Sequence, residues 1–74
     1  MNAVQRAIKE VGGVGALASK IGVTYQAVQQ WAKDGRVPAK RVLAIEAATA
    51  DRSGRPRVLR HDLRPDIYPE REAA

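Results

Sequence analysis

Glycines interrupt the first fifty residues of this chain at intervals that leave room only for short secondary-structure elements. They stand at positions 12, 13, 15, 22 and 35. Between them the apolar residues recur at helical spacing, as in Val4, Ile8 and Val11, which follow an i, i+4, i+7 pattern. The few β-branched residues do not alternate as a strand requires. The sequence therefore predicts an all-α fold, a compact bundle of four to five short helices.

Capping residues set the expected limits of each helix. Asn, Thr and Pro favour helix starts, and Gly favours helix ends. The predicted helices are a first from the N-cap Asn2 to Gly12, a second over 14–21, a third over 25–33 with Thr24 as N-cap, a fourth with Pro38 in its first turn and Thr49 near its end, and a last turn over 60–64 closed by Pro65.

The length of 74 residues and 8.1 kDa predicts one domain, which we expect to cover residues 1–69. Residues 51–57 are polar, basic and interrupted by Gly and Pro, so they form a loop that has the composition of a mobile segment. Residues 58–69 are predicted to pack on the helices through Leu63, Ile67 and Tyr68. Residues 70–74 are expected to fray.

Composition excludes several classes of function. The chain has no Cys and a single His, so a disulfide framework or a thiolate zinc site is absent, and we expect no metal or cofactor. Ser19, Ser53 and His61 form no recognisable catalytic triad, and a chain this short rarely encloses a deep pocket, so we expect no enzyme. No apolar run suits a membrane span or a signal peptide. A cytoplasmic protein, on the nucleoid when bound to DNA, is the expectation.

The net charge of +5 fits a polyanionic partner, although it also fits a merely soluble surface. Residues 14–31 decide between these readings, because they have the pattern of a helix-turn-helix. Ala18, in the first helix of this motif, is small where the next helix must cross it. Gly22 stands where the turn requires a positive φ. The wedge between the two helices is filled by apolar residues, namely Leu17, Ile21, Val23, Val28 and Trp31. The sequence thus predicts binding to double-stranded DNA.

A helical projection of the third helix, at about 100° per residue, turns Val28 and Trp31 inward. Its outward face carries amide side chains, and Gln can bond both N6 and N7 of adenine in the major groove. Tyr can hold a phosphate or pack on a thymine methyl group. The predicted base-reading residues are Tyr25, Gln26, Gln29 and Gln30. The alternative is that these glutamines are ordinary solvent-facing residues.

Cations and one hydroxyl surround that helix, and in helix-turn-helix proteins such sites grip phosphate. The predicted phosphate-binding residues are Lys20, Thr24, Lys33, Arg36, Lys40 and Arg41. The loop residues Arg52, Arg55 and Arg57 either add a flexible basic arm or simply solvate the loop.

Two segments of the chain resemble the YdaS-type regulators of prophages, within the superfamily of lambda Cro and lambda repressor. They are residues 21–31 with Gly35-Arg36-Val37-Pro38, and residues 44–49 with residues 60–69. The resemblance spans about residues 3–69 and implies a lambda repressor-like DNA-binding domain that regulates transcription, often as a repressor from phage or mobile-element genes. Relatives tend to have a hydroxyl N-cap where this chain has Leu59, which leaves the start of the last helical turn open.

Two further partners are consistent with the sequence, a second copy of the chain and a toxin protein. Helix-turn-helix modules usually act as dimers on half-sites roughly 34 Å apart, so a homodimer or higher oligomer on DNA is expected, with the fourth helix and the C-terminal block as candidate surfaces. Some relatives implied by the resemblance are labelled antitoxins. The alternative function is therefore an antitoxin-like interaction module whose main partner is a toxin protein.

Overall fold

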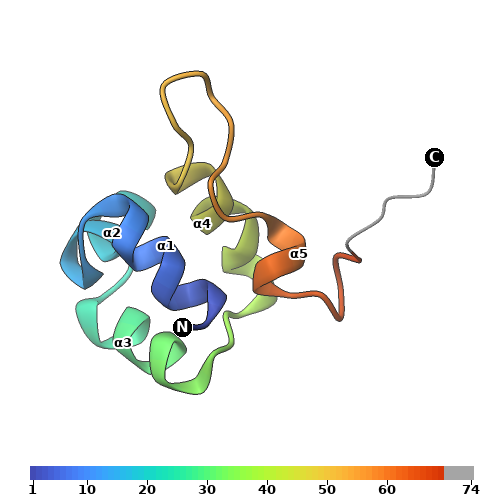
Figure 1. The fold of residues 1–74 in the computed structure, drawn as a ribbon. Coiled ribbons are helices and arrows are strands. Elements are labelled where there is room, and N and C mark those ends of the chain that lie inside the picture. Colours follow the sequence, from blue (N-terminus) through green and yellow to red (C-terminus); the bar gives the residue numbers. More distant parts are fainter. Residues whose placement is uncertain (70–74) are drawn as a thin grey trace.

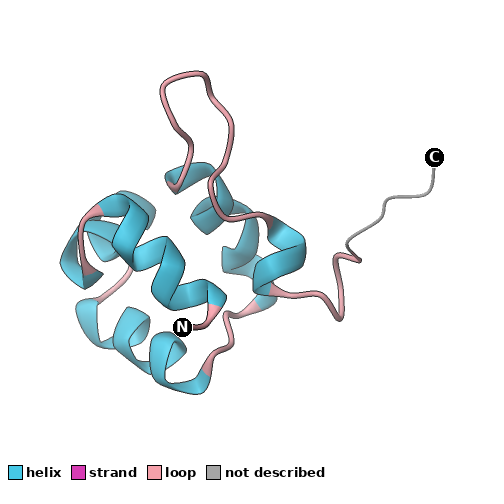
Figure 2. Ribbon diagram, viewed as in Figure 1, coloured by secondary structure: helices cyan, strands magenta, loops and turns pink. Residues whose placement is uncertain are grey.

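The computed structural model describes residues 1–69, and these residues form a small bundle of helices (Figure 1). The elements are α1 (Ala3–Val11), α2 (Val14–Ile21), α3 (Tyr25–Asp34), the 3₁₀ turn η1 (Ala39–Arg41), α4 (Val42–Ala48) and α5 (Arg60–Leu63). Within residues 1–69 there is no strand, only an isolated bridge between Ala50 and Pro56 (Figure 2). The predicted all-α fold is confirmed. The predicted fraying of residues 70–74 lies outside the described residues.

One aliphatic core joins all five helices. Its fully buried members come from each of the first four helices, and Val58 and Leu63 add the C-terminal segment to it. The buried residues are Val4, Ala7, Leu17, Ala18, Val28, Val37, Val42, Ile45, Val58 and Leu63. Burial of this aliphatic surface is the main stabilising term for a chain of this size.

The turns between the first three helices follow the sequence closely. Asn2 caps α1, since its side chain accepts the Gln5 N–H at 2.8 Å and its own N–H donates to Gln5 Oε1 at 3.0 Å. Gly22 ends α2 with φ of 74°, the left-handed region that a Cβ would disfavour. Thr24 caps α3 by accepting the Ala27 N–H at 3.0 Å. Gly35 closes α3 with φ of 73°, so α3 includes Asp34, one residue more than predicted.

The fourth helix differs from its predicted form. Pro38 lies before the helical residues, with an extended ψ of 142°, and the Arg41 N–H bonds its carbonyl at 2.9 Å. That i to i+3 bond produces a 3₁₀ turn ahead of α4. At the other end α4 stops at Ala48, because Thr49 turns inward. Its hydroxyl bonds the Glu46 carbonyl at 2.8 Å and accepts the Val58 N–H at 3.1 Å.

The start of α5 shows how a helix forms without a capping side chain of its own. Leu59 has no acceptor, yet α5 begins at Arg60. The carboxylate of Glu46, from α4, accepts the Arg60 N–H at 2.7 Å. Asp62 accepts the Leu59 N–H at 3.1 Å. A neighbouring helix therefore supplies the acceptor that sequence reasoning expected next to the helix start.

The C-terminal cluster was predicted only in part. Leu63 is buried and Tyr68 packs against the core, as expected. Ile67 was predicted to pack there as well, and this is wrong, since it is 43% exposed. The Ile67 and Tyr68 N–H groups both bond the Arg64 carbonyl, at 3.1 and 2.9 Å. This tight turn directs Tyr68 inward and leaves Ile67 in solvent.

Candidate nucleic-acid interface

Helix α3 is held at both ends and along its inner side. At its start, the turn at Gly22 and the cap at Thr24 join it to α2. At its end, the Asn2 Nδ2 donates to the Ala32 carbonyl at 2.9 Å, which ties the start of α1 to the last turn of α3. Val28 is fully buried between these contacts. The outer face of α3 is therefore presented on a fixed support, as precise recognition of a ligand requires.

The residues predicted to read bases all lie on the exposed side of α3. Tyr25, Gln26, Gln29 and Gln30 are solvent-exposed, while Ala27 and Trp31 are half-buried. Gln26, Gln29 and Gln30 also line an open surface depression next to Val14 of α2. The helical projection is thus correct about which side faces outward.

Two of these residues are engaged within the protein. Gln30 donates from Nε2 to Asp34 Oδ1 at 3.0 Å, one turn along α3. Tyr25 is 53% exposed, and its ring lies beside Gly15, where a Cβ would sit 3.8 Å from the ring carbon Cδ2. Among the side chains of this face, Gln26 and Gln29 have no hydrogen bond to the rest of residues 1–69. Their amides are available to an external partner.

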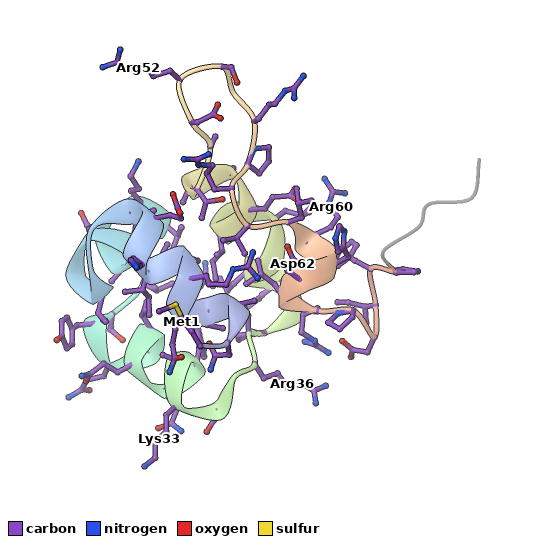
Figure 3. All side chains as sticks on the ribbon, in the orientation of Figure 1. Met1, Lys33, Arg36, Arg52, Arg60 and Asp62 are labelled. Carbon is purple, nitrogen blue, oxygen red and sulfur yellow. The ribbon has the colours of Figure 1, made fainter. Side chains whose placement is uncertain are left out.

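The predicted phosphate-binding residues divide into two groups. Lys33 and Arg36 project from the α3 side of the molecule (Figure 3). Lys40 and Arg41 lie in η1, which follows Arg36 closely in the sequence. Thr24 is at the exposed start of α3, where its oxygen is used as the N-cap acceptor and its hydroxyl proton can still be donated.

Lys20 is placed elsewhere. It borders hollows formed with Ala44 and Ala47 of α4 and with Arg52 and Arg57 of the 51–57 loop. That loop extends from the end of the molecule opposite α3 (Figures 1 and 3). The structure therefore does not bring Lys20 and the loop arginines together with Lys33 and Arg36. Whether the loop arginines and Lys20 contact DNA stays a prediction.

Sequence reasoning missed one acidic residue that bears on the interface. Asp66 Oδ2 lies 3.6 Å from Arg36 and 2.7 Å from the Nη2 of Arg64. Arg64 is buried and also donates from Nη1 to the Val37 carbonyl at 2.8 Å. The hydrogen bonds from Arg64 lower the pKa of Asp66 to about 2, and Arg36 adds to this effect. Asp66 thus connects the C-terminal segment to the residue that follows α3, and no local sequence signal marks a contact over that separation.

No three His, Asp or Glu side chains among residues 1–69 gather in a way that could hold a metal ion. The Nε2 of His61 lies 3.6 Å from the Oδ1 of its neighbour Asp62. In the same residues, no helix has the length and apolar character to cross a lipid bilayer.

Comparison with known families gives a match over nearly the whole chain. The family model described as "Bacterial toxin YdaS" matches residues 4–72. A curated relative, the "Putative transcriptional regulator YdaS" of Escherichia coli strain K12, is 45% identical over 64 residues, which cover 85% of this chain. The chain spans only 60% of that relative's length.

Two solved structures resemble this fold. The Cro protein from Xfaso 1 in Xylella fastidiosa strain Ann-1 matches with a TM-score of 0.77 and 42% identity, covering 90% of this chain and 95% of that one. The second is XPH1, a hybrid sequence of Xfaso 1 and Pfl 6, described as two Cro proteins with different folds. It has a TM-score of 0.59 and 43% identity, over 92% of this chain and 97% of that one.

Proposed function

The chain belongs to the YdaS family, and on this premise we propose that it is a transcriptional regulator that binds double-stranded DNA in a sequence-specific way, with α3 in the major groove. The observation that carries the proposal is the outer face of α3, where Gln26 and Gln29 lie exposed on a fixed support. The relative named a transcriptional regulator, YdaS of Escherichia coli, and the Cro protein from Xfaso 1 are both more than 40% identical to this chain. Such a protein acts in the cytoplasm, and we propose repression as its effect.

Roles within the interface follow from geometry. Gln26 and Gln29 lie three positions apart, so they share one helix face and read neighbouring bases through their amides. Tyr25 and Gln30 flank them and complete the base-reading set. Lys33, Arg36, Lys40 and Arg41, with the Thr24 hydroxyl, hold phosphates and set the register of α3 on the duplex. In this proposal Lys20 has no part in the same contact.

A second copy of the chain completes the proposal. The exposed side of α4 carries Leu43, which is 47% exposed, together with Ala44 and Ala47. Leu59, which precedes α5, is 37% exposed. These apolar groups are available for pairing, and a two-fold dimer would place two α3 helices on half-sites about 34 Å apart.

The test is the double variant Gln26→Ala/Gln29→Ala. Sequences bound by the wild-type protein are first selected from a random duplex pool, and binding is then measured on a selected and a scrambled duplex. We expect the variant to lose the discrimination between the two duplexes while keeping salt-sensitive non-specific binding. Lys9→Ala, on α1, is the control and should retain full discrimination. Unchanged discrimination in the double variant would contradict the assignment of α3.

A second candidate function rests on the family's description as a toxin. A toxin would act on another macromolecule of the cell. In the separate antitoxin-like alternative, this protein would bind a toxin protein instead. Controlled expression in Escherichia coli separates these functions. Growth arrest that persists in Gln26→Ala/Gln29→Ala favours the toxin, whereas a normal growth rate together with duplex binding favours the regulator.

A further inference from the structure

The 51–57 loop forms a second basic surface at the end of the molecule opposite α3 (Figure 1). It carries Arg52, Arg55 and Arg57, and Lys20 at the end of α2 borders the same hollow as Arg52 and Arg57. We call these four residues the distal basic surface. Figure 3 shows Arg52 at the tip of the loop, far from Lys33 on α3.

The backbone of this loop is held in a defined turn. The Asp51 carboxylate accepts the Ser53 and Arg55 N–H groups at 2.9 and 3.1 Å and the Ser53 hydroxyl at 2.6 Å. The Asp51 N–H donates to the Arg55 carbonyl at 2.9 Å. These contacts, first of all the Ser53 hydroxyl, lower the pKa of Asp51. The arginines therefore project from an ordered backbone rather than from a structureless tether.

The cations of this surface exceed the acids that could neutralise them. Glu10 of α1 pairs with Arg57 at 3.5 Å, and Asp51 is bound within the turn. Arg52, Arg55 and Lys20 form no ion pair with any residue among 1–69. The four cations of the surface thus outnumber its two acids, Glu10 and Asp51. A net positive surface raises the local concentration of an anionic partner.

The composition of the surface favours nucleic acid over protein. Protein–protein interfaces are built around large apolar or aromatic side chains within a polar rim. The large hydrophobic residues exposed in the described part of the chain are Met1, Tyr25, Leu43, Leu59 and Ile67, and none belongs to the loop. Arginine guanidinium groups without such an apolar centre match phosphate oxygens, which they bind in a bidentate way.

We propose that the distal basic surface binds the phosphate backbone of a second DNA segment while α3 occupies the first. The inference rests on the proposed function, since it assumes that α3 faces DNA. Because the two surfaces lie at opposite ends, they engage separate duplexes or separate stretches of one looped duplex. A repressor with this arrangement bridges DNA without requiring a further domain.

The test is a titration of ¹⁵N-labelled protein with a selected duplex at low salt, followed by the backbone amide signals. We expect the signals of α3 to shift until one equivalent of duplex has been added per α3 binding site and then to stay constant. The signals of Lys20 and residues 51–57 should shift only when more duplex is added. Arg52→Gln/Arg55→Gln should weaken the second step by about tenfold or more at low salt and leave the first unchanged. Lys33→Gln/Lys40→Gln also removes two charges and should weaken the first step while leaving the second unchanged.

Each other outcome has a distinct meaning. If the α3 signals shift and the loop signals never do, the inference is wrong and the proposed function stands. If only the loop signals shift, the proposed role of α3 fails and the distal surface is retained as a phosphate-binding site. If the loop responds to polyglutamate and not to duplex, the partner is an acidic protein and the inference is overturned. If the signals of neither region shift, both proposals are overturned.

Discussion

Charged groups are used in opposite ways by the C-terminal segment, residues 58–69, and by the α3 side of the molecule. In the C-terminal segment Arg60 is bound by Glu46 through two guanidinium nitrogens, at 3.0 and 3.2 Å, and stands 5.6 Å from the centre of the Tyr68 ring. Arg64 is bound by Asp66 and by a backbone carbonyl. By contrast, Lys33 of α3 and Lys40 of η1 are exposed and form no ion pair with any residue among 1–69.

This contrast separates charge that stabilises the fold from charge that is available to a ligand. A buried carboxylate is costly to leave without its partner, and Glu46 is only 8% exposed. Exposed cations contribute little to stability. Arg36 lies between the two regimes, because it is exposed but paired with Asp66.

The largest expected effect is on stability and comes from Glu46→Ala. The substitution removes the acceptor for the Arg60 N–H and guanidinium, so that of the acceptors at the start of α5 only Asp62 remains. We expect a loss of about 2–3 kcal/mol in the free energy of unfolding, measured by urea denaturation. Lys33→Ala on the α3 side should stay within about 0.5 kcal/mol of wild type. Equal losses in the two variants would remove the contrast between the regions.

A smaller effect is expected on DNA binding from Asp66→Asn. The substitution releases Arg36 from its acidic partner and removes a negative charge near the proposed phosphate contacts. We expect tighter binding of the first duplex at low salt, with the slope of log K against log salt steeper by about one unit. Glu10→Gln, which removes an acid at the distal end, serves as the control and should leave the slope for that first duplex unchanged. A weaker-binding Asp66→Asn that is still fully folded would show that Asp66 orients Arg36 productively instead.

The smallest effect is a pH dependence of stability in acid. Because the pKa of Asp66 is about 2 in the folded protein and about 3.9 in an unfolded chain, the folded state favours its ionised form. This contribution is fully present above about pH 4 and is lost as the pH falls through about 2. We expect the melting temperatures of wild type and Asp66→Asn to converge over that range. A constant difference between pH 5 and pH 2 would mean that the ion pair with Arg64 does not contribute.

The part of the structure that the sequence predicts also differs between the α3 side and the C-terminal segment. The first three helices, the turn at Gly22 and the outward face of α3 follow from local rules, because caps, glycines and helical periodicity act over a few residues. The 3₁₀ turn at Ala39–Arg41, the exposure of Ile67 and the cap of α5 did not follow from these rules. The α5 cap depends on Glu46, which only the folded chain brings near Arg60. The 3₁₀ turn and the exposure of Ile67 follow from local bonds to the Pro38 and Arg64 carbonyls, which helical periodicity does not predict.

Spacings of three or four residues are enough to predict an all-α, helix-turn-helix chain with a polar outer face on its third helix. Which cations share a surface depends instead on how the helices pack. Lys20 and Lys33 both stand in the last turn of a helix. Lys20 borders the same hollow as Arg52 and Arg57 of the loop, whereas Lys33 projects from α3 (Figure 3). Glu46 and Asp66 bind arginines to which no periodic pattern connects them. Packing of α4 against α5 brings Glu46 to Arg60, and packing of the C-terminal segment beside the residues after α3 brings Asp66 to Arg36. The fold leaves α3 exposed at one end and the 51–57 loop at the other (Figure 1).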